Sequence, residues 1–223
     1  MIPPIYIIGS EEREPKQIQY LKEYFKECNL SVTFFQPTWK DSLSISENAR
    51  FTKETHGRKF KDSEKSVFLN FLYLIEKCLA EGHEHVIIFE SDVIFENENF
   101  SNYIENLSHF IESFQPHCLS IGSGCDLIDD DVNTDDMTLQ IAKKPIVRCM
   151  DSQLFSREGL LLFKNYMDNY GVFDEPIDNF LQKYIELSDF SYYWVWPSIT
   201  LQGSQYGHYK SSIQGDDAAS ITR

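Results

Sequence analysis

Two carboxylates separated by a single residue, Glu90 and Asp92, are the part of this sequence best suited to chemistry. Side chains two positions apart in an extended segment point the same way, so both can present oxygen atoms to one ligand. Magnesium and manganese ions prefer such oxygen ligands, often take only one or two protein carboxylates, and complete their shell with water and phosphate. The spacing therefore predicts a divalent metal site that meets a phosphate group. The alternative is an acidic pair that merely begins a solvated turn.

The residues before this pair predict a strand at the centre of a sheet. Residues 85–89 are apolar on both faces, as in a strand that helices cover on both sides. A helix is expected from Asp62 or Ser63 to Gly82, because apolar residues recur at helical spacing between a favoured N-cap and a terminating glycine. Ligands of open α/β sheets collect outside the carboxyl ends of the strands. The acidic pair is therefore expected at the edge where a ligand binds.

A β-α-β unit opens the chain. Ile5–Ile8 is a short β-branched run that ends at Gly9, and residues 31–35 form a second run of this kind. Between them, apolar residues recur at helical spacing over 16–28, which predicts a helix. The polar stretch 36–58 contains proline and glycine and predicts a long loop with one helical turn.

Length and composition limit the possible classes. A chain of 223 residues fits one domain with a sizeable core. The net charge of -15 disfavours a nucleic-acid groove or an anionic membrane surface, since both would repel the protein. No apolar run approaches the length of a membrane span, so we expect a cytoplasmic protein. The five cysteines are widely scattered and form no C-x-x-C pair, which predicts reduced thiols.

The sequence around the acidic pair resembles a known family. The block Phe-Glu-Ser-Asp-Val-Ile-Phe over 89–95 resembles the Asp-x-Asp region of GT-A glycosyltransferases. Residues 63–94 are similar to the corresponding stretch of glycosyltransferase family 25, which includes lipooligosaccharide and procollagen galactosyltransferases. Members usually have Glu-Asp-Asp where this chain has Ser91 in the middle. The segments 149–159 and 197–213 resemble later blocks of the family.

This resemblance implies a fold and an activity. The implied fold is a single α/β domain of the GT-A (Rossmann-like) type over 1–223, with a mixed, mainly parallel central sheet flanked by helices. Residues 1–95 would form the nucleotide-binding half and 96–223 the acceptor-binding half. The implied reaction is inverting transfer of a hexose from a UDP-sugar, with Mn²⁺ or Mg²⁺, to a saccharide on a glycoprotein or surface glycan. This activity agrees with two biological settings. One is the assembly of bacterial surface glycans, and the other is capsid glycosylation by a large DNA virus in the host cytoplasm.

The resemblance and the local sequence together give a set of candidate site residues. Glu90 and Asp92 would hold the metal, joined by His208, because a late histidine often completes the metal shell in GT-A enzymes. The candidates for binding the nucleotide sugar are Ile8, Gly9, Arg13, Lys65, Ser91, Lys210 and Ser212. For Arg13, Lys65 and His208, the alternative is an exposed surface side chain.

Inversion requires a base for the acceptor hydroxyl. Asp178 is the first candidate, because Glu-Pro-Ile-Asp over 175–178 resembles the acidic helix start that supplies the base in inverting GT-A enzymes. The alternative is that Asp178 is a helix N-cap. Asp151, expected at the end of a strand over 146–150, is the competing base or a ligand for a sugar hydroxyl.

Other classes of function fit the sequence less well or stay open. A dinucleotide-binding enzyme is disfavoured, because Gly9 is not followed by a G-x-G-x-x-G turn. The acidic stretch 126–136 lacks the glycine and the last glutamate of a calcium-binding loop, which favours a solvated loop. A degenerate transferase that only binds a nucleotide sugar or a glycan stays open, since Ser91 removes one negative charge. So does a role as one part of a larger modular enzyme.

Overall fold

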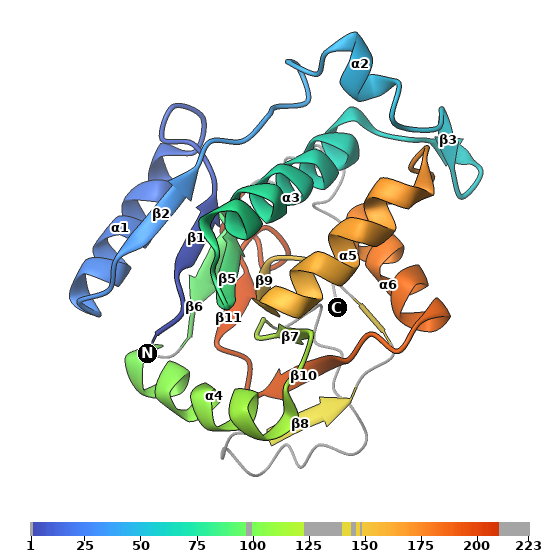
Figure 1. The fold of residues 1–223 in the computed structure, drawn as a ribbon. Coiled ribbons are helices and arrows are strands. Elements are labelled where there is room, and N and C mark those ends of the chain that lie inside the picture. Colours follow the sequence, from blue (N-terminus) through green and yellow to red (C-terminus); the bar gives the residue numbers. More distant parts are fainter. Residues whose placement is uncertain (1, 97–99, 123–139, 144–145, 148, 210–223) are drawn as a thin grey trace.

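A seven-stranded sheet forms the centre of the computed structural model (Figure 1). The structure describes residues 2–96, 100–122, 140–143, 146–147 and 149–209. Across the sheet the strands follow the order β2 (Val32–Phe35), β1 (Ile5–Ile8), β5 (His85–Glu90), β9 (Ser152–Ser156), β7 (Cys118–Ser120), β10 (Tyr192–Trp196) and β8 (Gln140–Lys143).

The sheet is mixed but mainly parallel, as predicted. Strands β2, β1, β5, β7 and β10 run in one direction, and β9 and β8 run against them. Ile8 pairs with Glu90 across β1 and β5, so these two strands end side by side. Because β9 is antiparallel to β5 and pairs Ser152 with Phe89, the chain enters β9 next to the end of β5. Three chain segments therefore meet at one point of the carboxyl edge.

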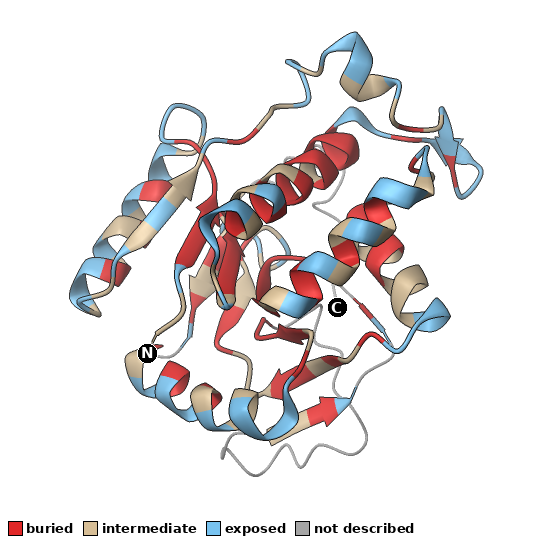
Figure 2. Cartoon of the chain, viewed as in Figure 1, coloured by how far each residue is buried: buried red, intermediate tan, exposed pale blue. Residues whose placement is uncertain are grey.

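Helices cover both faces of this sheet and divide the core into two layers. Helices α1 (Pro15–Glu27) and α4 (Phe100–Phe114) pack on one face, against the side chains of residues such as Ile7 and Phe89. Helices α3 (Asp62–Glu81), α5 (Arg157–Tyr170) and α6 (Ile177–Leu187) pack on the other. Figure 2 shows the buried residues gathered in the sheet and on the helix faces that meet it.

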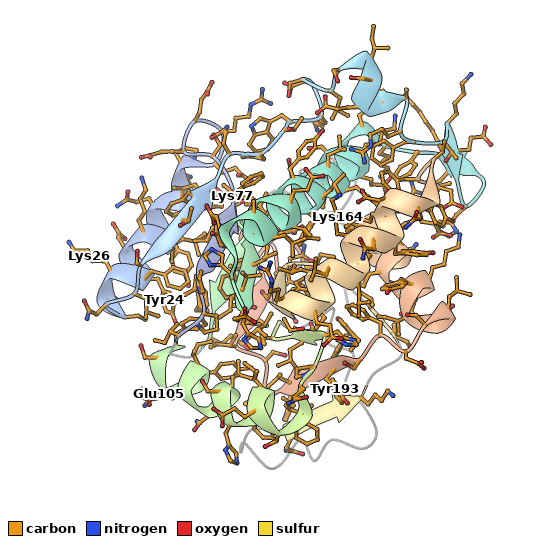
Figure 3. The ribbon with its side chains drawn as sticks, viewed as in Figure 1. Tyr24, Lys26, Lys77, Glu105, Lys164 and Tyr193 are labelled. Atoms are coloured by element: carbon orange, nitrogen blue, oxygen red, sulfur yellow. The ribbon has the colours of Figure 1, made fainter. Side chains whose placement is uncertain are left out.

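The packing of α3 against α5 combines an apolar face with polar contacts at the surface. The buried side of α3 includes Phe68, Phe71 and Leu72, which are fully enclosed. At the surface, the amine of Lys164 on α5, which Figure 3 labels, forms an ion pair with the carboxylate of Glu76 on α3 at 3.2 Å. Helix α3 ends as the sequence predicts, with Gly82 in the left-handed conformation at φ 76°.

Smaller elements connect these layers. The segment between β2 and α3 carries the short helix α2 (Ile45–Asn48) and the hairpin β3 (Glu54–Thr55) and β4 (Arg58–Lys59), in agreement with a long loop containing one helical turn. Directly after the acidic pair, β6 (Val93–Phe95) pairs antiparallel with β11 (Thr200–Gln202). Among the helices in the described part of the chain, none is both long and apolar enough to cross a membrane.

The prediction of a strand over 146–150 is wrong, because the described residues of this segment form no strand. Val147 is buried in the core beside α6, and its backbone N–H is donated to the side-chain oxygen of Gln182 at 2.6 Å instead of to a neighbouring strand. Cys149 has a φ of 58°, which an extended strand does not allow. The strand begins at Ser152, so Asp151 precedes a strand and does not follow one.

Candidate functional site

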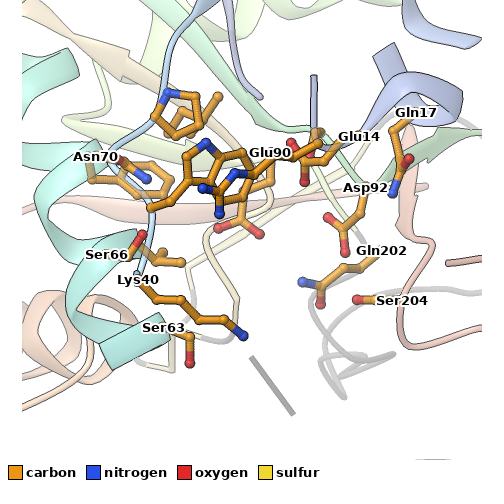
Figure 4. Close-up of a pocket in the computed structure, with 17 residues that line it drawn as sticks. Glu14, Gln17, Lys40, Ser63, Ser66, Asn70, Glu90, Asp92, Gln202 and Ser204 are labelled. Atoms are coloured by element: carbon orange, nitrogen blue, oxygen red, sulfur yellow. The ribbon is translucent and has the colours of Figure 1, made fainter. Parts of the chain in front are cut away.

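A cavity of about 220 Å³ opens at the carboxyl edge of β1 and β5 (Figure 4). Its walls come from five chain segments. Three begin at the last residue of a strand, namely 8–17 at β1, 90–92 at β5 and 202–204 at β11; the others are 37–40 after β2 and 63–71 of α3. Ile8, Arg13 and Ser91, together with Glu90 and Asp92, are the predicted site residues that line it. The acidic pair therefore lies at the carboxyl edge of the sheet, as expected, and beside a cavity.

The pairing of β6 with β11 brings a distant segment to the acidic pair. Gln202 pairs with Val93, and the N–H of Gly203 is donated to the carbonyl of Asp92 at 2.7 Å. Ser204 then forms hydrogen bonds with the Asp92 carboxylate. Gln202 and Ser204 belong to the segment 197–213 that resembles a later block of the family, and this C-terminal segment was expected to close the nucleotide pocket. They were not among the predicted site residues, because nothing local in the sequence predicts this pairing.

Two buried oxygen atoms at the cavity have no hydrogen-bond partner within the described part of the chain. They are Oδ1 of Asp92 and the side-chain oxygen of Gln202. Both residues line the cavity, where their side chains lie near one another (Figure 4). Buried oxygen atoms without partners are unfavourable, so a ligand that offers positive charge or donors would stabilise this corner.

The electrostatics of the site disfavour the ionised forms of its carboxylates. Burial raises the pKa of Glu90 well above its ordinary value, and the nearby carboxylates of Asp92, Asp151, Asp178 and Glu14 raise it further. Burial also raises the pKa of Asp92, although hydrogen bonds from Ser204 act in the opposite direction. Burial and like charges both disfavour ionised carboxylates, and a bound cation relieves both effects.

Glu14 is a site residue that sequence reasoning missed. Its carboxylate lines the cavity, accepts a hydrogen bond from the Ser91 hydroxyl at 2.7 Å, and accepts a second from the Ser10 N–H at 3.2 Å. Gly9 does not line the cavity but allows this contact, because a Cβ there would lie 2.7 Å from the Cβ of Ser91. The sequence feature that points to Glu14 is its position just before the first helix, in the loop after the first strand.

The predicted cationic residues have different surroundings. Arg13 lines the cavity, forms two bonds with the Asp41 carboxylate at 2.8 and 2.9 Å, and lies over the ring of Trp39 at 4.9 Å. Lys65 is outside the lining, since its amine is bound to Asn48 at 3.0 Å and to Asp62 at 2.9 Å. Lys40, which sequence reasoning did not select, lines the cavity instead.

The structure does not bring His208 to the acidic pair. His208 is exposed, its backbone N–H is donated to the carbonyl of Gly203 at 2.9 Å, and its side chain is not part of the cavity lining. Within the described ranges, no group of three or more His, Cys, Asp or Glu side chains is placed to hold a metal ion. Lys210 and Ser212 lie outside the described residues.

Both candidate bases lie close enough to Glu90 to raise its pKa, and neither lines the cavity. Asp151 is almost fully buried, its carbonyl accepts the N–H of Glu90 at 2.8 Å, and its carboxylate accepts the Ser152 hydroxyl at 3.0 Å. Asp178 is partly exposed in the first turn of α6. Because the N-cap of α6 is Pro176, the N-cap reading of Asp178 is wrong.

Comparison with solved structures gives only distant likenesses. A glycosyltransferase involved in the glycosylation of the major capsid of PBCV-1 shares 12% identity over 75% of this chain and 69% of its own, with a TM-score of 0.38. A mannose-1-phosphate geranyltransferase from Thermus thermophilus shares 11% identity over 91% of this chain and 74% of its own, with a TM-score of 0.44. No curated protein matches the sequence.

The sequence itself gives a firmer assignment. Residues 2–126 match the family described as "Glycosyltransferase family 25 (LPS biosynthesis protein)". This range is more than half of the 223 residues and holds β1, α3 and β5 together with the acidic pair. The chain belongs to glycosyltransferase family 25.

Proposed function

We propose that this protein transfers a sugar from a UDP-sugar to a hydroxyl of a saccharide acceptor, with inversion and with the help of a divalent cation. The observation that carries the proposal is the pair of buried, unpartnered oxygen atoms of Asp92 and Gln202 beside Glu90, among the residues that the structure describes. Family membership supports sugar transfer in general. The donor, the cation and the stereochemistry are the parts that we add.

The side chains at the cavity suit a hard cation. Glu90 and Asp92 offer carboxylate oxygens and Gln202 offers an amide oxygen, a donor set typical of magnesium or manganese and not of zinc. These three residues would hold the ion. When bound, such a cation stabilises the negative charge of a departing diphosphate. It would also offset the repulsion between an anionic donor and a protein of net charge -15.

Residues on the other walls would bind and orient the donor. Lys40 and Arg13 place positive charge at the cavity, where the carboxylates otherwise dominate. Ionic contacts with phosphate are favourable for both lysine and arginine. The side chain of Arg13 contacts the Asp41 carboxylate and the ring of Trp39, which favours one orientation before the donor arrives.

Asp178 is the better candidate for the base. The base takes the proton of the acceptor hydroxyl while that oxygen forms a bond to the sugar and the bond to the diphosphate breaks. The Asp178 carboxylate accepts the Asn179 N–H at 2.9 Å but is partly exposed, so an acceptor can approach it. Asp151 accepts the Ser152 hydroxyl and is enclosed, so an acceptor cannot reach it. Asp151 would therefore help to hold Glu90 in position without contacting the acceptor.

A panel of UDP-sugars incubated with the protein, manganese and simple saccharide acceptors tests this function. We expect release of UDP with at least one donor, and we expect EDTA to abolish it. The stereochemistry of the product, read by NMR, should show inversion. Manganese-dependent binding of UDP-sugars without any transfer would instead identify a binding module, the alternative that Ser91 leaves open.

A further inference from the structure

Glu14 occupies the N-cap position of α1, yet its side chain does not cap that helix. Residues with short polar side chains are favoured at N-caps because an oxygen reaches the first backbone N–H groups, and glutamate is not among them. The Glu14 carboxylate turns toward β5 instead, where one oxygen accepts the Ser91 hydroxyl at 2.7 Å. The side chain therefore serves the turn after β5 and not its own helix.

The surroundings of Glu14 make its charge unfavourable in the free protein. Burial raises the pKa of Glu14, and the charge of Asp92 raises it further, against hydrogen bonds from Ser91 and Ser10. The residue after β1 leaves room for the carboxylate, since a Cβ on Gly9 would lie 3.3 Å from a Glu14 oxygen and 2.8 Å from Ile18. A cation bound beside this carboxylate would offset its unfavourable charge.

We propose that Glu14 is a positioning residue of the donor site. Through its hydrogen bond with Ser91 it fixes the turn that carries Glu90 and Asp92. From the N-cap of α1 it also adds a negative charge beside this turn, whose middle residue, Ser91, has none. The inference rests on the proposed metal-dependent function. Groups that hydrogen-bond around metal ligands orient them, and an additional negative charge nearby strengthens attraction for a cation.

The first experiment measures manganese binding in the absence of any donor, by calorimetry on the full chain. Glu14→Gln keeps the size of the side chain but removes its charge, and we expect its manganese Kd to rise about 10-fold or more. Glu12→Gln is the matched control, since Glu12 is exposed two positions away and the substitution removes the same charge. Its Kd should equal that of the wild type.

A second variant separates a charge effect from a structural one. Ser91→Asp in the Glu14→Gln background returns a carboxylate to the turn, and we expect it to recover most of the lost manganese affinity. If Glu14 only held the turn in shape, this second substitution would not restore binding. Thermal unfolding in EDTA checks that both variants are folded, and Glu14→Gln should unfold at no lower temperature than the wild type.

The outcomes distinguish the two proposals. Manganese binding by the wild type with an equal Kd for Glu14→Gln overturns the role of Glu14 and leaves the proposed function standing. If Glu14→Gln binds manganese weakly and Ser91→Asp does not restore its affinity, the proposal that Glu14 acts through its charge is overturned. A wild type that binds no manganese overturns the metal dependence and the role of Glu14 together.

Discussion

Glu90 is held in surroundings that disfavour its charge, which predicts a conflict between stability and function. Its pKa in the folded protein is raised by burial and by four neighbouring carboxylates. The unfolded chain therefore loses this proton at lower pH than the folded chain does. Stability is lost as pH rises from the ordinary pKa of glutamate, about 4.3, through the raised value.

Glu90→Gln removes this conflict. In EDTA, the variant should unfold at a higher temperature than the wild type at pH 8, and the difference should shrink as pH falls toward about 4. With manganese and donor present, its kcat/KM should be lower by about 100-fold or more, because a cation ligand is lost. Calorimetric unfolding across pH and steady-state kinetics measure both effects. A lower unfolding temperature in EDTA at pH 8 would contradict this account of Glu90.

Asp178→Asn tests the assignment of the base. General base catalysis contributes about 10²- to 10⁴-fold, so kcat should fall by that amount. The Kd for manganese and UDP should change far less, because Asp178 affects Glu90 only through its charge. Rapid-quench measurement of a single turnover, paired with calorimetry, separates the two quantities. Asn179→Ala, at the next position of α6, is the control and should keep kcat within a few-fold of the wild type. An unchanged kcat in Asp178→Asn would transfer the role to Asp151.

Local sequence predicted the residues at the ends of strands but not those that distant pairing delivers. Glu90, Asp92 and Ile8 follow from buried strands whose carboxyl ends share an edge. Gln202 reaches the cavity only because β11 pairs with β6, a contact between segments about a hundred residues apart that no local pattern records. Lys65 looked available in the sequence, yet its amine is already bound within the fold.

At the scale of elements, the strands and helices with a strong apolar pattern were predictable. Strand β1 has the expected bounds, and α3 and β5 differ from the expectation by a residue or so. Strand β9 was misplaced because the apolar residues before it were read as a strand, whereas Val147 is buried by packing beside α6. Burial in an irregular segment gives the same local signal as burial in a strand.

The docking of α5 on the sheet depends on one glycine. A Cβ on Gly159 would lie 2.0 Å from the carbonyl oxygen of His117, which is backbone and cannot turn aside. Gly159→Ala should therefore destabilise the protein by about 3 kcal/mol, near the upper end for added volume in a packed site. Urea unfolding measures this, and Leu161→Ala, at an exposed position of the same helix, should change stability by less than about 1 kcal/mol. Equal effects would show that α5 adjusts freely.

At the scale of the whole molecule, the net charge of -15 predicts how donor binding responds to salt. Raising salt from about 0.01 M to about 0.1 M shortens the screening length from about 30 Å to about 10 Å. Without metal, UDP should bind more tightly as salt screens its repulsion by the protein. Manganese alone should bind less tightly over the same range. If added salt instead weakens the binding of UDP without metal, the attraction of UDP by Lys40 and Arg13 outweighs its repulsion by the net charge of the protein.

The central claim is that Asp92, with Glu90 and Gln202, holds a cation that the donor requires. The most direct measurement is calorimetric titration of UDP into the wild type and into Asp92→Asn, each with manganese and with EDTA. We predict binding by the wild type in manganese, much weaker binding in EDTA, and no gain from manganese in Asp92→Asn. Equal UDP affinity in all four titrations would contradict the claim.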